Sequence, residues 1–345
     1  MIRFLSDYME GAHPEVMHRL QETNLEQSPG YGADPHTQEA AERIRKACEC
    51  PEARVQFLVG GTQTNATVID GLLARHEGVL AAESGHINVH EAGAIEAAGH
   101  KVLTLPEHEG KVRAEEVDRY IENFYADATY PHMVAPGMLY ISHPTEYGTL
   151  YTRQELEALS AVCRRHRIPL YIDGARLIYG LAAEESELTL PQIARLADLF
   201  YIGGTKAGTL FGEALVITRP ELLPHLMPLV KQHGALLAKG RLLGVQFSAL
   251  FTDELYLKIG RHAVREARRI RDAFARAGYP AAIDSPTNQQ FFRLPNALID
   301  RLAQEVAFDY WGPRGESEST IRLVTSWATR PEDVDRLVEL LACEE

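Results

Sequence analysis

Three short segments of the sequence hold residues that could carry out chemistry together, and one of them contains Lys206. This lysine follows the strongly apolar run 198–204 and has glycines nearby on both sides, in GGTKAG. A lysine kept from water loses its charge more readily and becomes a nucleophilic amine that can form a Schiff base. A single lysine at a strand end more often extends into solvent, so this interpretation depends on the other two segments.

Asp173 stands in the second segment, IPLYIDGAR, at the point where an apolar run ends. Open α/β sheets bind ligands at that edge, and a buried carboxylate without a partner is costly. Arg176 offers one partner, in an ion pair that would be purely structural. Alternatively, Asp173 faces a protonated ring nitrogen and Arg176 binds a substrate anion.

The third segment, GGTQTNA at 60–66, follows the apolar run VQFLV and opens a helical stretch. Glycine lets a ligand approach the backbone closely, and the free N–H groups of a first helical turn favour an anion. Gly61, Thr62 and Gln63 are therefore the expected anion-binding residues. The plainer alternative is a strand-to-helix turn that needs glycine for its geometry. The segment is neither G-x-G-x-x-G nor a Walker motif, which argues against dinucleotides and triphosphates.

One cofactor combines an aldehyde, a phosphate and a basic ring nitrogen, and that cofactor is pyridoxal 5′-phosphate. Lys206 would bind its aldehyde, the glycine-rich turn its phosphate, and Asp173 would keep its ring nitrogen protonated. Two charges about 4 Å apart at an effective dielectric of about 20 interact by about 4 kcal/mol. That energy corresponds to at most about three pKa units. The sequence therefore predicts a pyridoxal-phosphate enzyme.

The chain also resembles the threonine aldolase and β-eliminating lyase family, within the large fold class of pyridoxal-phosphate enzymes typified by aspartate aminotransferase. The order of several segments, rather than any one of them, carries this resemblance, and together they cover nearly the whole chain. They are FLSDYMEGAHPEV, PGYGADPHT, FLVGGTQTNA, AAESGHINVHEAGAIEAAGHKV, IDGAR, GGTK and IRLVTSW.

The resemblance implies a role for each matching position around the cofactor. Lys206 would form the Schiff base, Asp173 would face the pyridine nitrogen, and Arg176 would lie beside the cofactor. Gly61 and Thr62 match the phosphate cradle.

On the substrate side, Ser6 and Arg322 match groups that bind the substrate carboxylate, with Arg176 as a further candidate. Tyr31 resembles a substrate-binding tyrosine that often reaches the site of a neighbouring subunit. The chain departs from the family pattern at Tyr8, at 142–145 and at Ser326, and these departures concern the substrate side chain.

His86, in SGHI, matches an imidazole that lies against the cofactor ring. A histidine between a strand and a helix is also commonly a hydrogen-bonded structural residue. Over the ring it could stack, or act through a water as the base that takes the proton of a β-hydroxyl group, since imidazole titrates near neutral pH. Glu91, five residues on, would either orient His86 or lie on the helix face.

The expected reaction is the cleavage of a threonine-like β-hydroxy-α-amino acid to glycine and an aldehyde. Lys206, His86 and Asp173 are the expected catalytic residues. The alternatives are β-elimination from an amino acid with a leaving group, and transamination. A nucleotide-dependent oxidoreductase is a further alternative, but the sequence lacks the dinucleotide-binding fingerprint. A non-catalytic α/β protein that binds a partner is another; it would be colourless, whereas a Schiff base gives a yellow protein.

The elements that must position these residues alternate along the first two-thirds of the chain. Seven short apolar runs between 55 and 218 are separated by amphipathic helical stretches, which predicts a large α/β domain with a mostly parallel sheet between helices. A long helical pattern over 252–277 stops at Gly278, and the residues after it predict antiparallel strands and a closing helix. We therefore expect an N-terminal arm (1–30), a large cofactor-binding domain (31–235) and a smaller α+β domain (236–345).

Composition limits the partners and the compartment. The 345 residues carry 35 Lys and Arg against 48 Asp and Glu, a net charge of −13, which argues against nucleic acid and membrane surfaces. No apolar run approaches a membrane span, no spacing indicates a metal site, and Cys48, Cys50, Cys163 and Cys343 suggest free thiols. We expect a cytoplasmic protein that acts on a small amino acid, as a homodimer or homotetramer with shared active sites.

Overall fold

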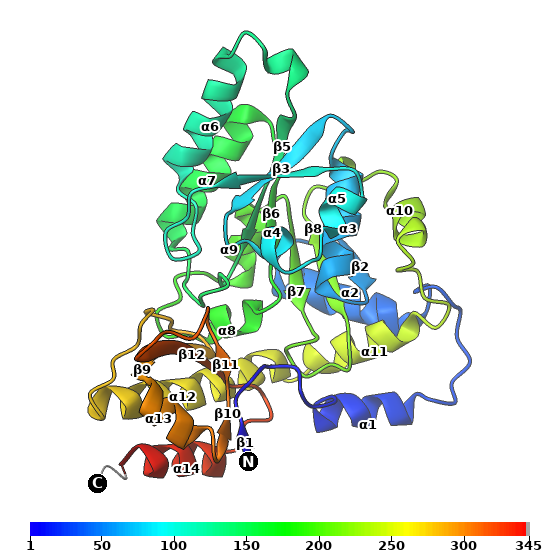
Figure 1. Cartoon of the computed structure of the whole chain (residues 1–345). Helices are drawn as coiled ribbons and strands as arrows, with labels where there is room; N and C mark the ends of the chain where they lie inside the picture. Colours follow the sequence, from blue (N-terminus) through cyan, green and yellow to red (C-terminus); the bar gives the residue numbers. More distant parts are fainter. Residues whose placement is uncertain (343–345) are drawn as a thin grey trace.

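The structure is a computed structural model that describes residues 1–342; residues 343–345, with Cys343 and the end of the predicted small domain, lie outside the described part. Its centre is a seven-stranded sheet of order β2-β8-β7-β6-β5-β3-β4 (Figure 1). Strands β3 to β7 run parallel, and β8 runs antiparallel to both β7 and β2. Each strand coincides with one of the seven predicted runs: β2 Arg54–Leu58, β3 Glu77–Ala82, β4 Lys101–Leu105, β5 Ala135–Ser142, β6 Leu170–Asp173, β7 Leu199–Gly203 and β8 Glu213–Ile217.

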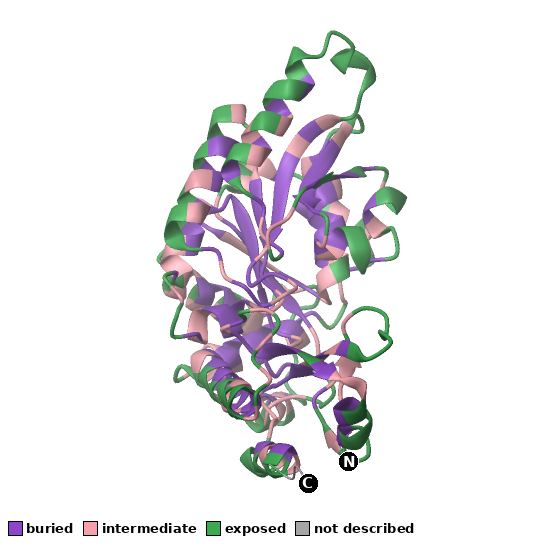
Figure 2. Cartoon of the chain, turned by 60° about the vertical axis from the view of Figure 1, so that its left-hand side comes forward, coloured by how far each residue is buried: buried purple, intermediate pink, exposed green. Residues whose placement is uncertain are grey.

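Helices cover both faces of this sheet, as the apolar runs predict for a sheet that is buried on two sides. Because side chains alternate along a strand, Ile141 and Ile172 face one layer while Tyr140 and Tyr171 face the other. Figure 2 shows the strands buried and the outer sides of the helices exposed. The first layer contains α2 Pro35–Ala47, α6 Ala114–Ala126, α7 Arg153–His166 and α9 Leu190–Leu196; the second contains α3 Gly61–Leu72, α5 Ala94–Ala97 and α10 Leu226–Gln232.

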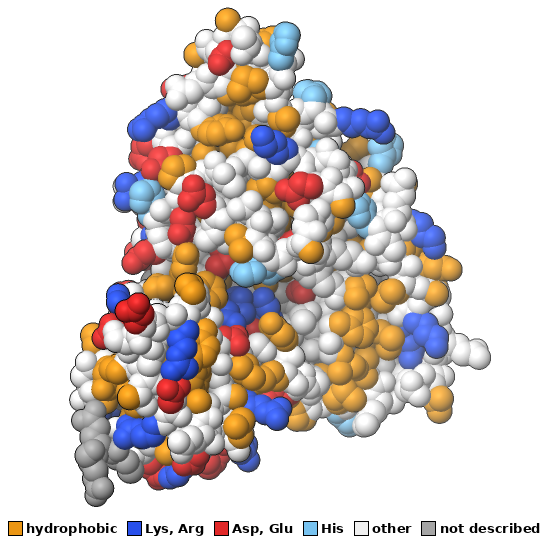
Figure 3. Space-filling view, in the orientation of Figure 1, with side chains coloured by type: hydrophobic (Ala, Val, Ile, Leu, Met, Phe, Trp, Pro, Cys, Tyr) orange, Lys and Arg blue, Asp and Glu red, His pale blue; other side chains and the backbone are white. Residues whose placement is uncertain are grey.

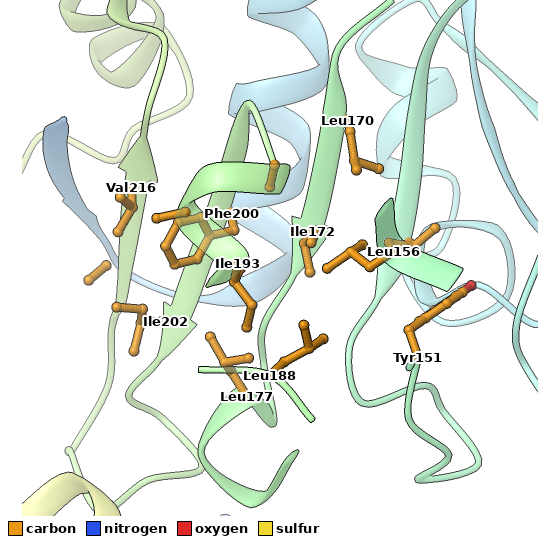
Figure 4. Packing of buried hydrophobic residues seen from close by; sticks show 14 of the residues in the cluster. Tyr151, Leu156, Leu170, Ile172, Leu177, Leu188, Ile193, Phe200, Ile202 and Val216 are labelled. Atoms are coloured by element: carbon orange, nitrogen blue, oxygen red, sulfur yellow. The ribbon is translucent and has the colours of Figure 1, made fainter. Parts of the chain in front are cut away.

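The first layer is closed by branched and aromatic side chains. Figure 4 shows Phe200 and Ile202 of β7 beside Ile193 of α9. All three are fully buried. Burying a side chain of this size contributes about 1.5–3 kcal/mol to the stability of the fold. This packing holds the carboxyl ends of β6 and β7 in place, and the site residues follow those ends.

The helix limits agree with the local sequence signals. Thr152 and Glu155 form the predicted capping box of α7, in which each side chain accepts from the other residue's backbone N–H. The long predicted helix is α12, Leu255–Arg276, and Gly278 follows it with φ +86°. Only glycine adopts such an angle freely, which explains why the helix ends there.

The C-terminal part forms a smaller unit below the large sheet in Figure 1. A three-stranded antiparallel sheet of order β11-β12-β9 packs on the second half of α12 and on the closing helix. The elements are β9 Gln289–Pro295, α13 Asn296–Leu302, β10 Val306–Ala307, β11 Asp309–Tyr310, β12 Glu318–Val324 and α14 Pro331–Ala342. The α+β character and the final helix agree with the sequence prediction.

The N-terminal segment ties the two units together. Strand β1, Ile2–Arg3, pairs in parallel with β10 of the small unit, whereas α1, Pro14–Glu22, packs on α11, Arg241–Leu250. Helix α11 in turn packs on α2 of the large unit, although the predicted boundary assigns it to the small one. The remaining short elements are α4 His86–Val89, α8 Leu177–Ala182, η1 Tyr130–His132 and η2 Pro220–Leu222.

None of the helices in residues 1–342 combines the length and the apolar character that crossing a membrane requires.

Candidate active site

A cavity of about 590 Å³ lies where the carboxyl ends of the large-sheet strands meet the small unit. Figure 3 shows a hollow between the two units in which basic and acidic side chains gather, with a histidine at its rim. Seven of the predicted site residues line the cavity: Gly61, Thr62, His86, Asp173, Arg176, Lys206 and, from β12, Arg322.

Lys206 lies in the loop between β7 and β8, with its backbone carbonyl accepting a hydrogen bond from the hydroxyl of Tyr179 at 2.5 Å. Its Nζ is 5.9 Å from the ring centre of Tyr8. Burial lowers the pKa of Lys206, and the nearby Arg176 guanidinium lowers it further, against the opposing charges of Asp7 and Asp173. The amine is thus biased toward its uncharged, nucleophilic form.

Asp173 ends β6 and is almost completely buried, yet its partners are neutral donors. Oδ1 accepts from the Tyr201 hydroxyl at 2.5 Å and from the Ala175 N–H at 3.0 Å. Oδ2 accepts from the Tyr140 hydroxyl at 2.7 Å and from the Asn65 amide at 3.0 Å. Burial alone would raise the pKa of Asp173, but the charge of His86 and these hydrogen bonds lower it. The carboxylate therefore stays ionised.

Of the two alternatives for Asp173 and Arg176, the structural ion pair between them is wrong. Arg176 instead binds Asp7, with Nε 2.8 Å from Oδ2 and Nη2 3.1 Å from Oδ1. Asn288 donates a further hydrogen bond to Asp7 at 2.9 Å. Burial opposes ionisation of Asp7, but the charges of Arg176 and Lys206, together with the hydrogen bonds from Arg176 and Asn288, lower its pKa overall. A short-range sequence pattern cannot reveal this pair, whose members lie 169 positions apart.

The glycine-rich turn starts α3, whose N-cap Gly60 makes no side-chain capping hydrogen bond. The N–H groups of the first helical turn are consequently without a cap, and a Cβ placed at Gly60 would meet no atom within 4 Å. Gln63 does not take part in the cavity lining. Its Oε1 accepts from the Val59 N–H at 3.1 Å and its Nε2 donates to the His233 carbonyl at 3.2 Å, so its side chain braces the turn from outside.

His86 begins α4, and its side chain is held by a chain of hydrogen bonds between buried polar groups. Its Nδ1 lies 2.7 Å from Oε1 of Glu91, and the Asn65 amide donates to the same oxygen at 2.7 Å. Asn65 links this chain to Asp173. Burial opposes a charge on His86, but the hydrogen bond with Glu91 and the charges of Asp173 and Glu91 raise its pKa overall. Glu91 therefore orients His86, the first of the two predicted alternatives.

Arg322 reaches the cavity from β12 and has a free donor. Its Nη2 lies 2.7 Å from Asp309 and its Nη1 3.1 Å from Gln289, and the guanidinium lies 5.3 Å from the ring centre of Trp311. Its Nε is buried and makes no hydrogen bond within residues 1–342. An unpaired buried donor of this kind is costly, and a carboxylate entering the cavity would satisfy it.

Two predicted residues lie outside this cavity. Ser6 lines a separate depression with Ser326 at the N-terminal end of the chain, while its neighbour Asp7 points to Arg176. Tyr31 is 54% exposed, and the Lys231 ammonium lies 5.4 Å from its ring centre. Within one chain neither side chain meets the cofactor residues.

The chain matches a known protein family and proteins of known structure. Residues 3–296 match the family described as Beta-eliminating lyase. The chain belongs to the β-eliminating lyase family. A threonine aldolase of known structure from Leishmania major is 42% identical, with a TM-score of 0.96 over 99% of each chain. A protein named Low specificity L-threonine aldolase, from Pseudomonas aeruginosa, is 29% identical over 98% of this chain and 95% of its own length.

The fold extends beyond this family. The aspartate aminotransferase of Thermus thermophilus is 17% identical, with a TM-score of 0.71 over 99% of this chain and 91% of its own. The resemblance and the fold class predicted from the sequence are therefore confirmed. The family and the fold are those of pyridoxal-phosphate-dependent lyases, which confirms the predicted enzyme class.

Two buried carboxyls of this chain were not found from the sequence. Glu146 follows β5 and its Oε1 accepts from the Ser142 hydroxyl at 2.6 Å and from the His86 N–H at 3.0 Å; burial raises its pKa. Glu213 opens β8, and burial raises its pKa to about 8. Glu213 stands in the apolar run EALVIT, which reads as a strand, so the only available signal was an acidic residue at the start of a buried strand.

Proposed function

We propose that this enzyme uses pyridoxal 5′-phosphate to cleave a threonine-like β-hydroxy-α-amino acid into glycine and an aldehyde. The observation that carries the proposal is the convergence of Lys206, Asp173 and the uncapped start of α3 on one cavity. The names of the relatives, both of them threonine aldolases, favour cleavage of the Cα–Cβ bond over the β-elimination that the sequence left open.

The residues present fit this cofactor. The uncapped amides of Gly61 and Thr62 suit a phosphate, and Lys206 supplies an amine with a lowered pKa for the aldehyde. Asp173 supplies an ionised carboxylate for the ring nitrogen. When bound, the cofactor withdraws electrons from the substrate Cα, and the protein decides by orientation which bond is affected.

Binding of the substrate carboxylate falls to the two arginines. The buried Nε of Arg322 is available to a carboxylate. Its Nη2 is bound to Asp309, a half-exposed residue that the substrate carboxylate could displace. Arg176 is anchored by Asp7 through Nε and Nη2, which leaves Nη1 for an anion. Fixing the carboxylate fixes the direction of the Cα–Cβ bond, which is the purpose of such positioning.

His86 is the candidate base for the β-hydroxyl proton. Because Glu91 binds Nδ1, the proton of neutral His86 is held there and Nε2 is left to accept a second one. Glu91 then stabilises the resulting imidazolium, which is the effect that raises the pKa of His86. Ring stacking by His86 is compatible with the same position.

The predicted homodimer or homotetramer with shared active sites is part of this proposal. Its support is indirect: Tyr8 is 56% exposed although it lies at the cavity, and Tyr31 is 54% exposed. Figure 3 shows hydrophobic side chains gathered beside the hollow. A second subunit would cover such side chains and would bring its Tyr31 within reach of the small-molecule substrate.

Product analysis tests the reaction. The purified enzyme with pyridoxal 5′-phosphate is given L-threonine and L-allo-threonine, and separately an amino acid with a β leaving group. Glycine and an aldehyde in equal amounts from the hydroxy amino acids are expected. Pyruvate and ammonia from the leaving-group substrate, with no glycine from either threonine, would replace the proposal by β-elimination. The variant Lys206→Ala is expected to form neither product set.

A further inference from the structure

Glu213 lies between the two segments that bind the opposite ends of the proposed cofactor. As the first residue of β8 it pairs with Leu58 of β2 on one side and with Gly203 of β7 on the other. Strand β2 leads directly to the glycine-rich turn, and β7 leads directly to Lys206. The Glu213 side chain is 3% exposed and lines the cavity. A carboxyl group is therefore buried beside the expected phosphate, where a negative charge would be unfavourable.

The hydrogen bonds of Glu213 link it to a hydroxyl that also lines the cavity. Its Oε2 accepts from the Gly204 N–H at 3.0 Å, and its Oε1 lies 2.8 Å from Oγ1 of Thr205. The same Oγ1 accepts from the Gly212 N–H at 3.1 Å. Thr205 and Glu213 thus both line the cavity and are joined by a hydrogen bond.

We propose that Glu213 keeps a proton while the cofactor is bound, and that it uses this proton to turn the Thr205 hydroxyl toward the cofactor's phosphate. This inference rests on the proposed function. It assigns a phosphate-positioning role to a residue pair, Glu213 and Thr205.

The protonation state of Glu213 decides the direction of its hydrogen bond with Thr205. A hydroxyl has one proton to donate and two lone pairs that accept. If Glu213 is ionised, Thr205 must donate to it and has no proton for an anion. If Glu213 is protonated, it donates to Thr205, the Gly212 N–H fills the second lone pair, and the Thr205 proton is free to bind phosphate.

The surroundings of Glu213 favour its protonated form. Burial and the charge of Asp173 on β6 raise its pKa to about 8, against the opposing effects of Lys206 and of the hydrogen bonds from Thr205 and Gly204. The other titratable groups that interact with it are tyrosines of β6, β7 and α12, namely Tyr171, Tyr201 and Tyr256. Helix α11 contributes the apolar side chain of Phe247 next to Gly204. A bound phosphate adds another negative charge and favours the proton still more.

The variant Glu213→Gln tests the inference because glutamine copies the protonated arrangement. Its oxygen can accept from the Gly204 N–H and its NH₂ group can donate to Thr205. The measurement is the dissociation constant of pyridoxal 5′-phosphate, by cofactor absorbance, from neutral pH to well above about 8, the value to which burial raises the pKa of Glu213. Wild-type affinity is expected to fall by about tenfold per pH unit above that value relative to Glu213→Gln.

Pyridoxal, which lacks the phosphate, separates this effect from an effect on Lys206. A difference between wild type and Glu213→Gln with pyridoxal phosphate only supports the inference. An equal difference with pyridoxal, or parallel pH curves for the two proteins, would overturn it. Failure of both proteins to bind pyridoxal phosphate at any pH would instead count against the proposed function.

Two further variants complete the design. Glu221→Gln makes the same chemical change at an exposed position after β8 and is expected to match wild type throughout. Thr205→Val removes the donating hydroxyl, so at neutral pH it is expected to bind the cofactor as weakly as wild type does in alkali, with the extra pH dependence lost. Wild-type affinity in Thr205→Val would overturn the inference even if Glu213→Gln failed to fold.

Discussion

The guanidinium of Arg176 and the carboxylate of Asp7 form a two-point ion pair in the floor of the cavity, with Nε 2.8 Å from Oδ2 and Nη2 3.1 Å from Oδ1. This pair joins the N-terminal segment to the end of β6. It also sets the charge that Lys206 experiences, because Arg176 lowers and Asp7 raises the pKa of the lysine.

Removing one member of this pair is expected to destabilise the protein strongly. Asp7→Ala leaves Arg176 buried without its counter-ion, a change that costs about 3–5 kcal/mol. The free energy of unfolding in urea measures it. Because the pKa of Asp7 is lowered in the folded state, its contribution is present above the unfolded value of about 3.9 and is lost as the pH falls through the folded value.

The double variant Asp7→Leu with Arg176→Met is the matched control. It removes both charges together and is expected to recover most of the lost stability while remaining inactive. A single variant as stable as wild type at neutral pH would show that the pair has no structural role.

Asp173→Asn is expected to leave the fold intact and to reduce turnover by about a hundredfold or more. The carboxylate is worth about 4 kcal/mol to a cationic ring nitrogen, whereas an amide offers it no charge. Steady-state rates with L-threonine measure the loss. Tyr140→Phe removes only one of the four donors to Asp173 and should cost far less; equal losses in the two variants would argue against a charge effect.

Glu91 is expected to set the acid side of the pH profile. A base must be neutral, so activity rises as His86 loses its proton, and the raised pKa of His86 puts that rise at a higher pH. Glu91→Gln removes the charge that raises the pKa, so the acid limb of kcat/KM should move to lower pH. Glu96→Gln, at an exposed position on the neighbouring α5, should leave the limb in place. A uniform drop in rate at every pH would mean that Glu91 acts only structurally.

Mixed subunits test the shared site. Lys206→Ala and Tyr31→Ala are each expected to be inactive, but subunits of the two variants, mixed after dissociation, should regain activity, because one site then has both intact residues. Mixing Lys206→Ala with Arg322→Ala should give none, since both of those residues line the cavity of one chain. No recovery in the first mixture would remove Tyr31 from the site of the neighbouring subunit.

Much of the fold could be predicted because its signals are local. Seven apolar runs of strand length, the Thr152 capping box and the helix stop at Gly278 each depend on a few neighbouring residues. Lys206, Asp173 and Thr62 could be found for the same reason, since each follows directly on a predicted strand and strand ends meet at one edge of the sheet.

The remaining site residues depend on contacts between distant segments. Asp7 meets Arg176 only after the N-terminal segment packs across the domain. Tyr140 and Tyr201 lie inside apolar strands and read as core residues until their hydroxyls are seen to converge on Asp173. Gln63 was expected to bind the cofactor as part of the first helical turn after the glycines, and its side chain turns back to Val59.

Trapping with borohydride tests most directly whether Lys206 holds the cofactor. The enzyme is loaded with pyridoxal 5′-phosphate, reduced, digested and examined by mass spectrometry for modified lysine among the seven in the chain. We expect a yellow protein that is bleached by the reduction and carries one phosphopyridoxyl group per chain, on Lys206. Adducts on exposed lysines alone, or a protein that stays colourless with the cofactor, would contradict the mechanism.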